Sequence, residues 1–240
     1  MQNTLLTYFN KRLGREDLHE KKKTNPGPVI TISRQVGCNG VKLAKKIADK
    51  LNEHPAFSTW KLLSKEIFYE SAKELDMEPE KIRRMFKQEE SFTLTDIINS
   101  LGTRRFKSEK KIVRTVKEII YSFAEDGYCI IVGRAAHIIA SDIKNALHVR
   151  LYAPLKYRVK TIMENNLLNM EEAYEFISKV EKERIAFRNT IGGINTETDL
   201  FDIFINRATF DDEDTIYLII KAAEKKGIFK DYLDLPHLYL

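Results

Sequence analysis

Short apolar runs alternate with amphipathic stretches along this chain, and the alternation predicts strands separated by helices. Five runs rich in β-branched or apolar residues predict strands, at 28–32, 60–63, 128–132, 146–152 and 201–205. The run at 128–132 is apolar without interruption, which is typical of a strand buried on both faces of a parallel sheet. The pattern therefore predicts an α/β fold with a doubly wound parallel sheet.

Helices are predicted between these strands by apolar positions three and four residues apart. The spacing is clear after the first strand, at Ala44, Ile47, Ala48 and Leu51. The stretch from 65 to about 123 is charge-rich and helical in pattern, with a loop-like centre near 88–92 and Gly102. A closing helix near 212–226 has acidic residues first and basic residues last, as the helix dipole favours.

Residues 1–26 are predicted to form an N-terminal helical extension, set apart by a breaker of proline and glycine at 24–28. The charged run at 20–23 precedes this breaker. A lysine run of this kind is either a solvated linker or a contact for an anionic partner, and the linker is the simpler interpretation. Residues 27–240 are expected to form one domain with an insertion, and two small domains are the alternative.

Composition narrows the class of protein. Lys and Arg number 40 and Asp and Glu 35 in 240 residues, for a net charge of +5. This excess is too small to indicate nucleic acid, but it is compatible with a site that collects phosphates. The two cysteines, Cys38 and Cys129, form no metal-ligand spacing with each other or with histidine, so no metal site is predicted.

The same composition predicts a cytoplasmic protein with no membrane partner. No apolar run reaches the ~20 residues that span a bilayer. The N-terminal pattern also differs from a signal peptide, because basic residues follow a short apolar stripe with no cleavage-like segment. The low cysteine usage fits a reducing compartment.

The strongest chemical signal lies in the turn after the first strand. Ser33 and Arg34 end the strand, Gly37 and Gly40 follow, and an amphipathic helix begins behind them. Such a turn presents backbone N–H groups and the positive end of a helix dipole to an anion, as nucleotide-binding proteins do for phosphates. Cys38 lies in this turn, where the helix N-terminus predicts a lowered thiol pKa unless the cysteine is simply a small packed side chain.

A second strand end carries similar chemistry, because the run at 128–132 leads directly into Gly133 and Arg134. The carboxyl ends of parallel strands meet at one edge of a sheet, so Arg34 and Arg134 are expected to lie near each other. Arginine suits phosphate because its planar fork makes bidentate, charge-assisted hydrogen bonds. Either arginine alone fits a surface or ion-paired role equally well; together with the glycine turn they predict an anion pocket.

A third cationic group is predicted on a helix that begins at a capping box formed by Asn169 and Glu172. Three charged residues then share one face of this helix: Glu181, Arg184 and Arg188. Arg158, on the preceding helix, would join them if the two helices form a hairpin. A hairpin of arginines that closes over phosphates excludes water and neutralises charge in phosphoryl transfer; a solvated face with incidental ion pairs is the alternative.

Several sequence pieces also occur together in a recognisable order. They are Ile30-Thr31-Ile32-Ser33-Arg34-Gln35 with Gly37-x-x-Gly40, Ser64-Lys65-Glu66-Ile67, Ile130-Ile131-Val132-Gly133-Arg134, Ala153-Pro154-Leu155-x-x-Arg158, Val180-x-Lys182-x-Arg184 leading to Gly192, and Phe201-Asp202-Ile203-x-x-Asn206. With these pieces the chain resembles the cytidylate kinase-like family, P-loop relatives of nucleoside monophosphate kinases, from about 28 to 222. Each piece is weak alone, and their order makes the resemblance specific.

The resemblance implies a fold and an activity. The fold is a three-layer, P-loop NTPase-like α/β core with a five-stranded parallel sheet, a helical monophosphate-binding insertion near 65–125 and a helical lid near 155–193. The activity is transfer of a phosphoryl group from ATP, with Mg²⁺, to CMP or dCMP. The partner implied is a small-molecule nucleotide.

The resemblance also implies roles for individual residues. The phosphate loop comprises Ser33, Arg34, Gly37, Gly40 and Lys42. The acceptor is bound by Arg134, with Glu66 as the nearest spare carboxylate. The catalytic lid arginines are Arg158, Arg184 and Arg188.

The turn departs from an active phosphate loop. A GxxxxGK[ST] pattern would place its lysine at position 40 and its hydroxyl near 41 or 42, but the chain has Gly40, Val41 and Lys42. The lysine neutralises phosphate charge and the hydroxyl binds Mg²⁺, so the loop by itself predicts neither ATP nor metal use. Val132 likewise stands where simple bacterial cytidylate kinases carry an acid.

The family resemblance and the missing lysine and hydroxyl of the turn leave two function classes open. One is a nucleoside monophosphate kinase-like phosphotransferase, and the other is a catalytically inactive protein that binds a nucleotide or phospholigand on the same fold. Nucleic-acid binding through the basic stretch at 81–117 ranks last, because Glu89 and Glu90 interrupt it. The sequence does not determine the oligomeric state.

Overall fold

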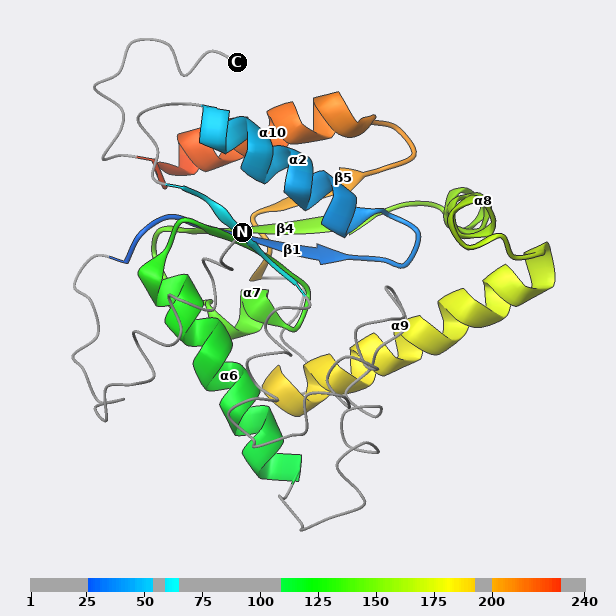
Figure 1. Cartoon of the computed structure of the whole chain (residues 1–240), viewed down its shortest axis with the longest axis horizontal. Helices are drawn as coiled ribbons and strands as arrows, with labels where there is room; N and C mark the ends of the chain where they lie inside the picture. The colour runs from blue at the N-terminus through cyan, green and yellow to red at the C-terminus, as the bar shows by residue number, and fades with distance from the viewer. Residues whose placement is uncertain (1–25, 54–58, 65–108, 193–199, 230–240) are drawn as a thin grey trace, which may run out of the picture.

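The computed structural model describes residues 26–53, 59–64, 109–192 and 200–229. Within them, parallel strands form a five-stranded sheet in the order β2-β3-β1-β4-β5 (Figure 1). The strands are β1 (Val29–Arg34), β2 (Lys61–Leu63), β3 (Cys129–Val132), β4 (Ala146–Tyr152) and β5 (Ile203–Asn206). The predicted five-stranded parallel sheet is confirmed.

Helices cover both faces of the sheet and complete three layers (Figure 1). One face carries α2 (Gly40–Glu53) and α10 (Asp212–Lys226), and the other carries α6 (Glu109–Asp126), α7 (Ala136–Ile139) and the C-terminal part of α9 (Met170–Gly192). Alternation along β1 supplies both cores, since Ile30 packs with α2 and Val29 packs with α6. All of β3 is buried, as a strand covered on both faces requires.

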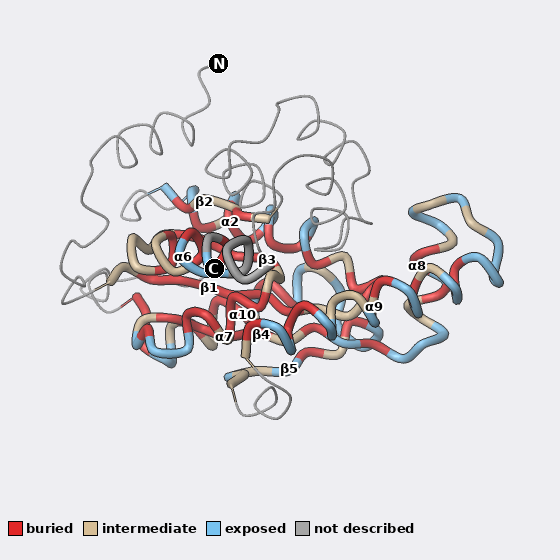
Figure 2. Tube along the Cα trace, turned by 90° about the horizontal axis from the view of Figure 1, so that it is seen from below, coloured by how far each residue is buried: buried red, intermediate tan, exposed pale blue. Residues whose placement is uncertain are grey.

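The predicted helix pair after β4 is present and reaches beyond the carboxyl ends of the strands (Figures 1 and 2). It consists of α8 (Leu155–Asn166) and α9, which pack against each other. The capping box is confirmed, because the Glu172 N–H donates to Asn169 Oδ1 at 3.0 Å and the Asn169 N–H donates to Glu172 Oε2 at 2.8 Å. Val36, in the turn after β1, is buried in the small core of this hairpin.

Two element predictions need correction. The last strand begins at Ile203 rather than 201, because the Asp202 carboxylate already accepts the His148 N–H of β4, at 2.7 Å. The four-residue helix α7 was not predicted, since it follows left-handed residues at Gly133 and Arg134 that leave no periodic signal. The closing helix lies at 212–226 as predicted.

Some predictions lie outside the described residues. They are the N-terminal helical extension, most of the helical insertion near 65–125, and Glu66. Of that insertion, α6 is the part that the structure describes. Among the helices that are described, none is long and apolar enough to cross a bilayer.

Candidate functional site

The candidate site lies at the carboxyl edge of the sheet, where the turns after β1 and β3 meet. β1 lies between β3 and β4, and Ile32 pairs in register with Val132. The Gly133 N–H donates to the Ile32 carbonyl at 2.9 Å, which joins the two turns directly. In open α/β sheets, ligands bind outside the carboxyl ends of the strands where the strand order reverses, as it does beside β1.

The Arg34 side chain crosses this edge between two glycines. A Cβ built on Gly40, the first residue of α2, would lie 3.0 Å from Cγ of Arg34 and 3.3 Å from its Cδ. A Cβ on Gly133 would overlap a guanidinium nitrogen of Arg34 and lie 3.0 Å from its Cζ. The stem of Arg34 therefore lies along Gly40, and its guanidinium lies on Gly133.

Arg134 is held in place by an unusual backbone. Gly133, Arg134 and Ala135 have φ values of 77°, 58° and 54°, and left-handed geometry costs a non-glycine residue about 1–2 kcal/mol. Strain of this kind is concentrated at functional sites. Desolvation, followed by the nearby charge of Arg184, lowers the pKa of Arg134 to about 9. Two like charges thus lie close together at this edge, where an anion would be stabilised.

Arg184 connects α9 to the end of β1. Its Nη1 donates a 3.2 Å hydrogen bond to the backbone carbonyl of Arg34, and its charge acts on Arg134. The structure therefore brings together Arg34, Arg134 and Arg184, from three segments far apart in sequence. This meeting was expected from the strand-end and lid patterns.

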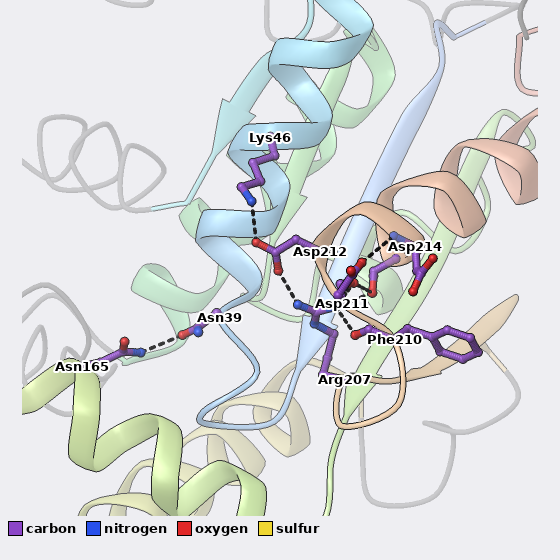
Figure 3. Close-up of polar contacts among 9 residues, drawn as sticks. Asn39, Lys46, Asn165, Arg207, Phe210, Asp211, Asp212 and Asp214 are labelled. Carbon is purple, nitrogen blue, oxygen red and sulfur yellow. Dashed lines mark hydrogen bonds and ion pairs between the residues drawn. The ribbon is translucent and has the colours of Figure 1, made fainter. Parts of the chain in front are cut away.

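The hairpin contacts the turn of residues 35–40 at several points. Gly37 has φ +88°, and a Cβ there would lie 2.7 Å from the carbonyl oxygen of Arg158 and 2.8 Å from its Cα. Asn165, at the end of α8, donates to Asn39 Oδ1 at 2.8 Å (Figure 3). Only glycine permits the approach of α8 at position 37, so the glycine pattern of the turn serves the hairpin as well.

Glu181 is the acidic residue of this contact, and it had no predicted role. Its carboxylate accepts the backbone N–H of Val36 at 2.7 Å and pairs with Arg158 Nη1 at 3.5 Å. Arg158 Nε donates to the Ala153 carbonyl at 3.0 Å. The helix face that was predicted to carry Glu181 and Arg184 therefore faces the turn. One backbone amide of the turn, that of Val36, is hydrogen-bonded to the Glu181 carboxylate.

The remaining predicted site residues are placed less directly. Ser33 Oγ accepts a 2.6 Å hydrogen bond from Arg150 Nη1 of β4. Lys42 is exposed in the first turn of α2. Arg188 is buried further along α9, where its charge helps burial to lower the pKa of His137. The roles proposed for these residues stay predictions.

Cys38 settles an alternative left open by the sequence. The thiol is 1% exposed, and burial raises its pKa to about 11 despite the nearby charges of Arg158 and Arg207. The prediction of a lowered pKa at the helix N-terminus is therefore wrong, because desolvation outweighs the dipole and the arginines. Cys38 is a small packed side chain.

Arg207 is a buried arginine that the sequence patterns missed. It follows β5, and its guanidinium donates to the Phe210 carbonyl at 2.8 Å, to Thr215 and to Asp212 (Figure 3). Asp212 also pairs with Lys46 of α2 at 2.7 Å. The rule that identified Arg34, an arginine at the carboxyl end of a parallel strand, applies equally to Arg207 and would have found it.

The positions of the turn and of β3 where the resemblance implies oxygen ligands for Mg²⁺ carry valine. Val41 and Val132 occupy the positions of the expected hydroxyl and acid, and both lack an oxygen donor in the side chain. Within the part of the chain that the structure describes, no group of three or more His, Cys, Asp or Glu side chains is placed to hold a metal ion. The site instead offers guanidinium groups and backbone amides, the donor set of phosphate oxygens.

Comparison with known proteins identifies a family and a curated relative. The profile of the cytidylate kinase-like family matches residues 29–209, which include the turn, Arg134, the hairpin and β5. A curated cytidylate kinase from Methanopyrus kandleri is 25% identical over 204 residues, covering 81% of this chain and 92% of that protein.

A solved structure shares the fold. An uncharacterised protein from Eubacterium ventriosum superposes with a TM-score of 0.59 at 22% identity, covering 82% of this chain and 98% of its own. A shikimate kinase from Bacteroides thetaiotaomicron covers 87% of this chain and 99% of its own, but at 13% identity and a TM-score of 0.42 it carries no weight. At these identities the structural likeness is one of fold alone.

Proposed function

This chain belongs to the cytidylate kinase-like family, and on that premise we propose that it is a nucleoside monophosphate kinase-like phosphotransferase. The proposed donor is ATP and the proposed acceptor is CMP or dCMP; the name of the curated relative, cytidylate kinase, supports a cytidylate acceptor. A cytoplasmic location is part of the proposal, and the free state of both Cys38 and Cys129 supports it.

The observation that carries the proposal is the meeting of Arg34, Arg134 and Arg184 at the edge between the turns after β1 and β3. Phosphoryl transfer requires little covalent chemistry from the protein, so positioning and charge neutralisation supply most of the rate. Guanidinium groups from three segments lie next to the amides of a helix N-terminus. This arrangement is suited to hold the phosphate groups of the donor and of the acceptor side by side.

In the proposed reaction, an oxygen of the acceptor phosphate attacks the γ-phosphorus of ATP, and the bond from that phosphorus to the bridging oxygen of ADP breaks. The turn, through Ser33, Arg34, Gly37, Gly40 and Lys42, binds the donor phosphates. Arg134 orients the acceptor phosphate, and Glu66 is proposed as a further acceptor-binding residue.

The lid arginines complete the proposed site. Arg158, Arg184 and Arg188 stabilise the negative charge on the transferred group, and the hairpin of α8 and α9 excludes water. Mg²⁺ would enter bound to the ATP phosphates and neutralise part of their charge.

A coupled assay that detects ADP tests the proposal, with ATP–Mg²⁺ as donor and CMP, dCMP, UMP, AMP and GMP as acceptors. We expect turnover with the cytidine monophosphates. Absence of turnover with every acceptor would contradict the proposed reaction.

A catalytically inactive phospholigand-binding protein is the second candidate. It is favoured by Gly40 and Val41, which replace the expected lysine and hydroxyl, and by the Glu181 carboxylate on the amide of Val36. It predicts that nucleotide increases the free energy of unfolding by RT ln(1 + [L]/Kd), and so raises the melting temperature, while the coupled assay stays at background.

A further inference from the structure

The turn after β1 keeps the length of a P-loop but exchanges the residues at its two ends. With the lysine of the GxxxxGK[ST] pattern at position 40, the glycines of the pattern fall at positions 34 and 39. This chain has Arg34, Asn39 and Gly40 there. Asn39 keeps the left-handed backbone of a glycine, with φ 48°. The cation therefore stands where the pattern has glycine, and glycine stands where the pattern has the cation.

The two exchanged positions are in contact. A Cβ at Gly40 would lie 3.0 Å from Cγ of Arg34, and 3.3 Å from both its Cβ and its Cδ. A side chain at position 40 would therefore require the Arg34 stem to shift by a few tenths of an ångström. A lysine at position 40 would pack directly against this stem, so we expect the effects of changes at the two positions to be coupled.

We propose that Arg34 supplies to the donor phosphates the positive charge that a P-loop lysine supplies from position 40. This inference rests on the proposed function and assigns one residue's role within it. The Arg34 guanidinium lies on Gly133, at the edge between the turns after β1 and β3. A guanidinium group can donate two charge-assisted hydrogen bonds to phosphate oxygens at once, so it can replace an ammonium group.

Further contacts fit this role. Arg184 of α9 donates to the Arg34 carbonyl at 3.2 Å, which ties the lid to the residue that carries the charge. Arg150 donates to Ser33 Oγ at 2.6 Å and holds the end of β1. Lys42, by contrast, is exposed in the first turn of α2, with nothing that fixes its ammonium group over the turn among the described contacts.

The exchange is tested with Arg34→Gln, Arg34→Gly, Gly40→Lys and the double variant Arg34→Gly/Gly40→Lys. Inorganic tripolyphosphate is titrated into each by calorimetry, because it carries the donor's phosphates without the nucleoside. We expect both Arg34 variants to bind about tenfold more weakly or worse, as loss of a charge-assisted hydrogen bond predicts. Gly40→Lys should also bind more weakly, since its side chain would crowd the Arg34 stem, and the double variant should recover most of the affinity.

Arg114→Gln is the control, because Arg114 is an exposed arginine of α6 paired with Glu118, and its affinity should equal that of the wild type. Melting curves establish that each variant is folded; Arg34→Gln keeps the stem and serves if Arg34→Gly does not fold. Unchanged affinity in Arg34→Gln overturns the role of Arg34. A double variant that binds no better than the weaker single variant overturns the exchange.

The outcomes separate this inference from the proposed function. A wild type that binds tripolyphosphate through Arg34 but phosphorylates no monophosphate contradicts the function and supports the role of Arg34. A wild type that phosphorylates CMP, with an Arg34→Gln variant equally active at subsaturating ATP, supports the function and overturns the role of Arg34. A wild type that binds no tripolyphosphate also overturns it.

Discussion

The carboxylate of Glu181, on α9, accepts a 2.7 Å hydrogen bond from the backbone N–H of Val36, in the turn after β1. The same carboxylate pairs with Arg158 at 3.5 Å. A carboxylate of the lid therefore accepts a hydrogen bond from the turn that we propose to bind phosphate. It also neutralises part of the positive charge of Arg158. A bound phosphate would compete with this internal anion.

Glu181→Gln should tighten the binding of ATP. The amide side chain keeps the size of the original and removes a negative charge beside the turn, so we expect affinity to rise roughly threefold to tenfold, or about 1 kcal/mol. Calorimetric titration at low and high salt measures the change, which should shrink as salt screens it. Glu175→Gln, an exposed position on the same helix, should have no effect. Weaker binding in Glu181→Gln would mean that the carboxylate supports the site.

Arg184→Gln should lower kcat by about a hundredfold or more, as loss of one transition-state donor does in other enzymes. The melting temperature should change little, because Arg184 is only half-buried. Steady-state assays with the best acceptor measure kcat and KM separately. Lys182→Ala removes an exposed charge two residues away and should leave kcat unchanged. A kcat within a few fold of wild type in Arg184→Gln contradicts the proposed lid role.

Gly37→Ala should destabilise the protein and weaken phosphate binding together. The new Cβ would meet backbone atoms of Arg158 at 2.7–2.8 Å, at a residue with φ +88°, so the turn and α8 must separate. Gly227→Ala, at the end of α10 with φ 76°, is the comparison variant, because it also carries the positive-φ penalty of about 1–2 kcal/mol. Chemical denaturation should show a larger loss for Gly37→Ala. Equal losses in the two variants would show that the contact with α8 contributes nothing.

Stability should fall as the pH drops from 7 to 5. Burial is the largest cause of a lowered pKa at two histidines. It helps to bring the pKa of His137 to about 3 and that of His148 to about 4. Below about pH 6.5 the unfolded state therefore binds protons that the folded state does not, which costs roughly 2 kcal/mol per histidine at pH 5.

Asp126 acts in the opposite direction. Burial raises its pKa to about 6, so the folded state takes up a proton first and regains roughly 1 kcal/mol at pH 5. Urea denaturation at pH 7, 6 and 5 should show a net loss, and the loss should be larger in Asp126→Asn. Stability that does not change over this range would be inconsistent with two neutral, buried histidines.

Arg207→Lys should cost about 2–4 kcal/mol of stability, because lysine keeps the charge but not the fork that serves Phe210, Thr215 and Asp212. Lys46→Ala breaks the outer pair with the same Asp212, and at 45% exposure of the lysine side chain it should cost less than about 1 kcal/mol. Thermal denaturation of the two variants gives the comparison. Similar losses would contradict a special role for the buried guanidinium.

Much of the fold was predictable because its signals are local. The apolar run at 128–132 and the capping box at Asn169 depend on residues only a few positions apart, and both are confirmed. The start of the last strand was misplaced because Asp202 makes its hydrogen bond to a residue of another strand. The pKa of Cys38 was misjudged because burial, a property of the packed core, outweighs the helix N-terminus.

Local sequence patterns were enough to identify the residues at the strand ends, the charged face of the 170–192 helix and the missing loop lysine. The contacts between distant segments came only from the folded chain. Glu181 reaches the Val36 amide across 145 positions, and Arg34 lies along Gly40 and on Gly133. Periodicity reports neighbours within a few residues. Contacts between the turn and the hairpin depend instead on the strand order and on how α8 and α9 pack beyond the sheet, which no local pattern encodes.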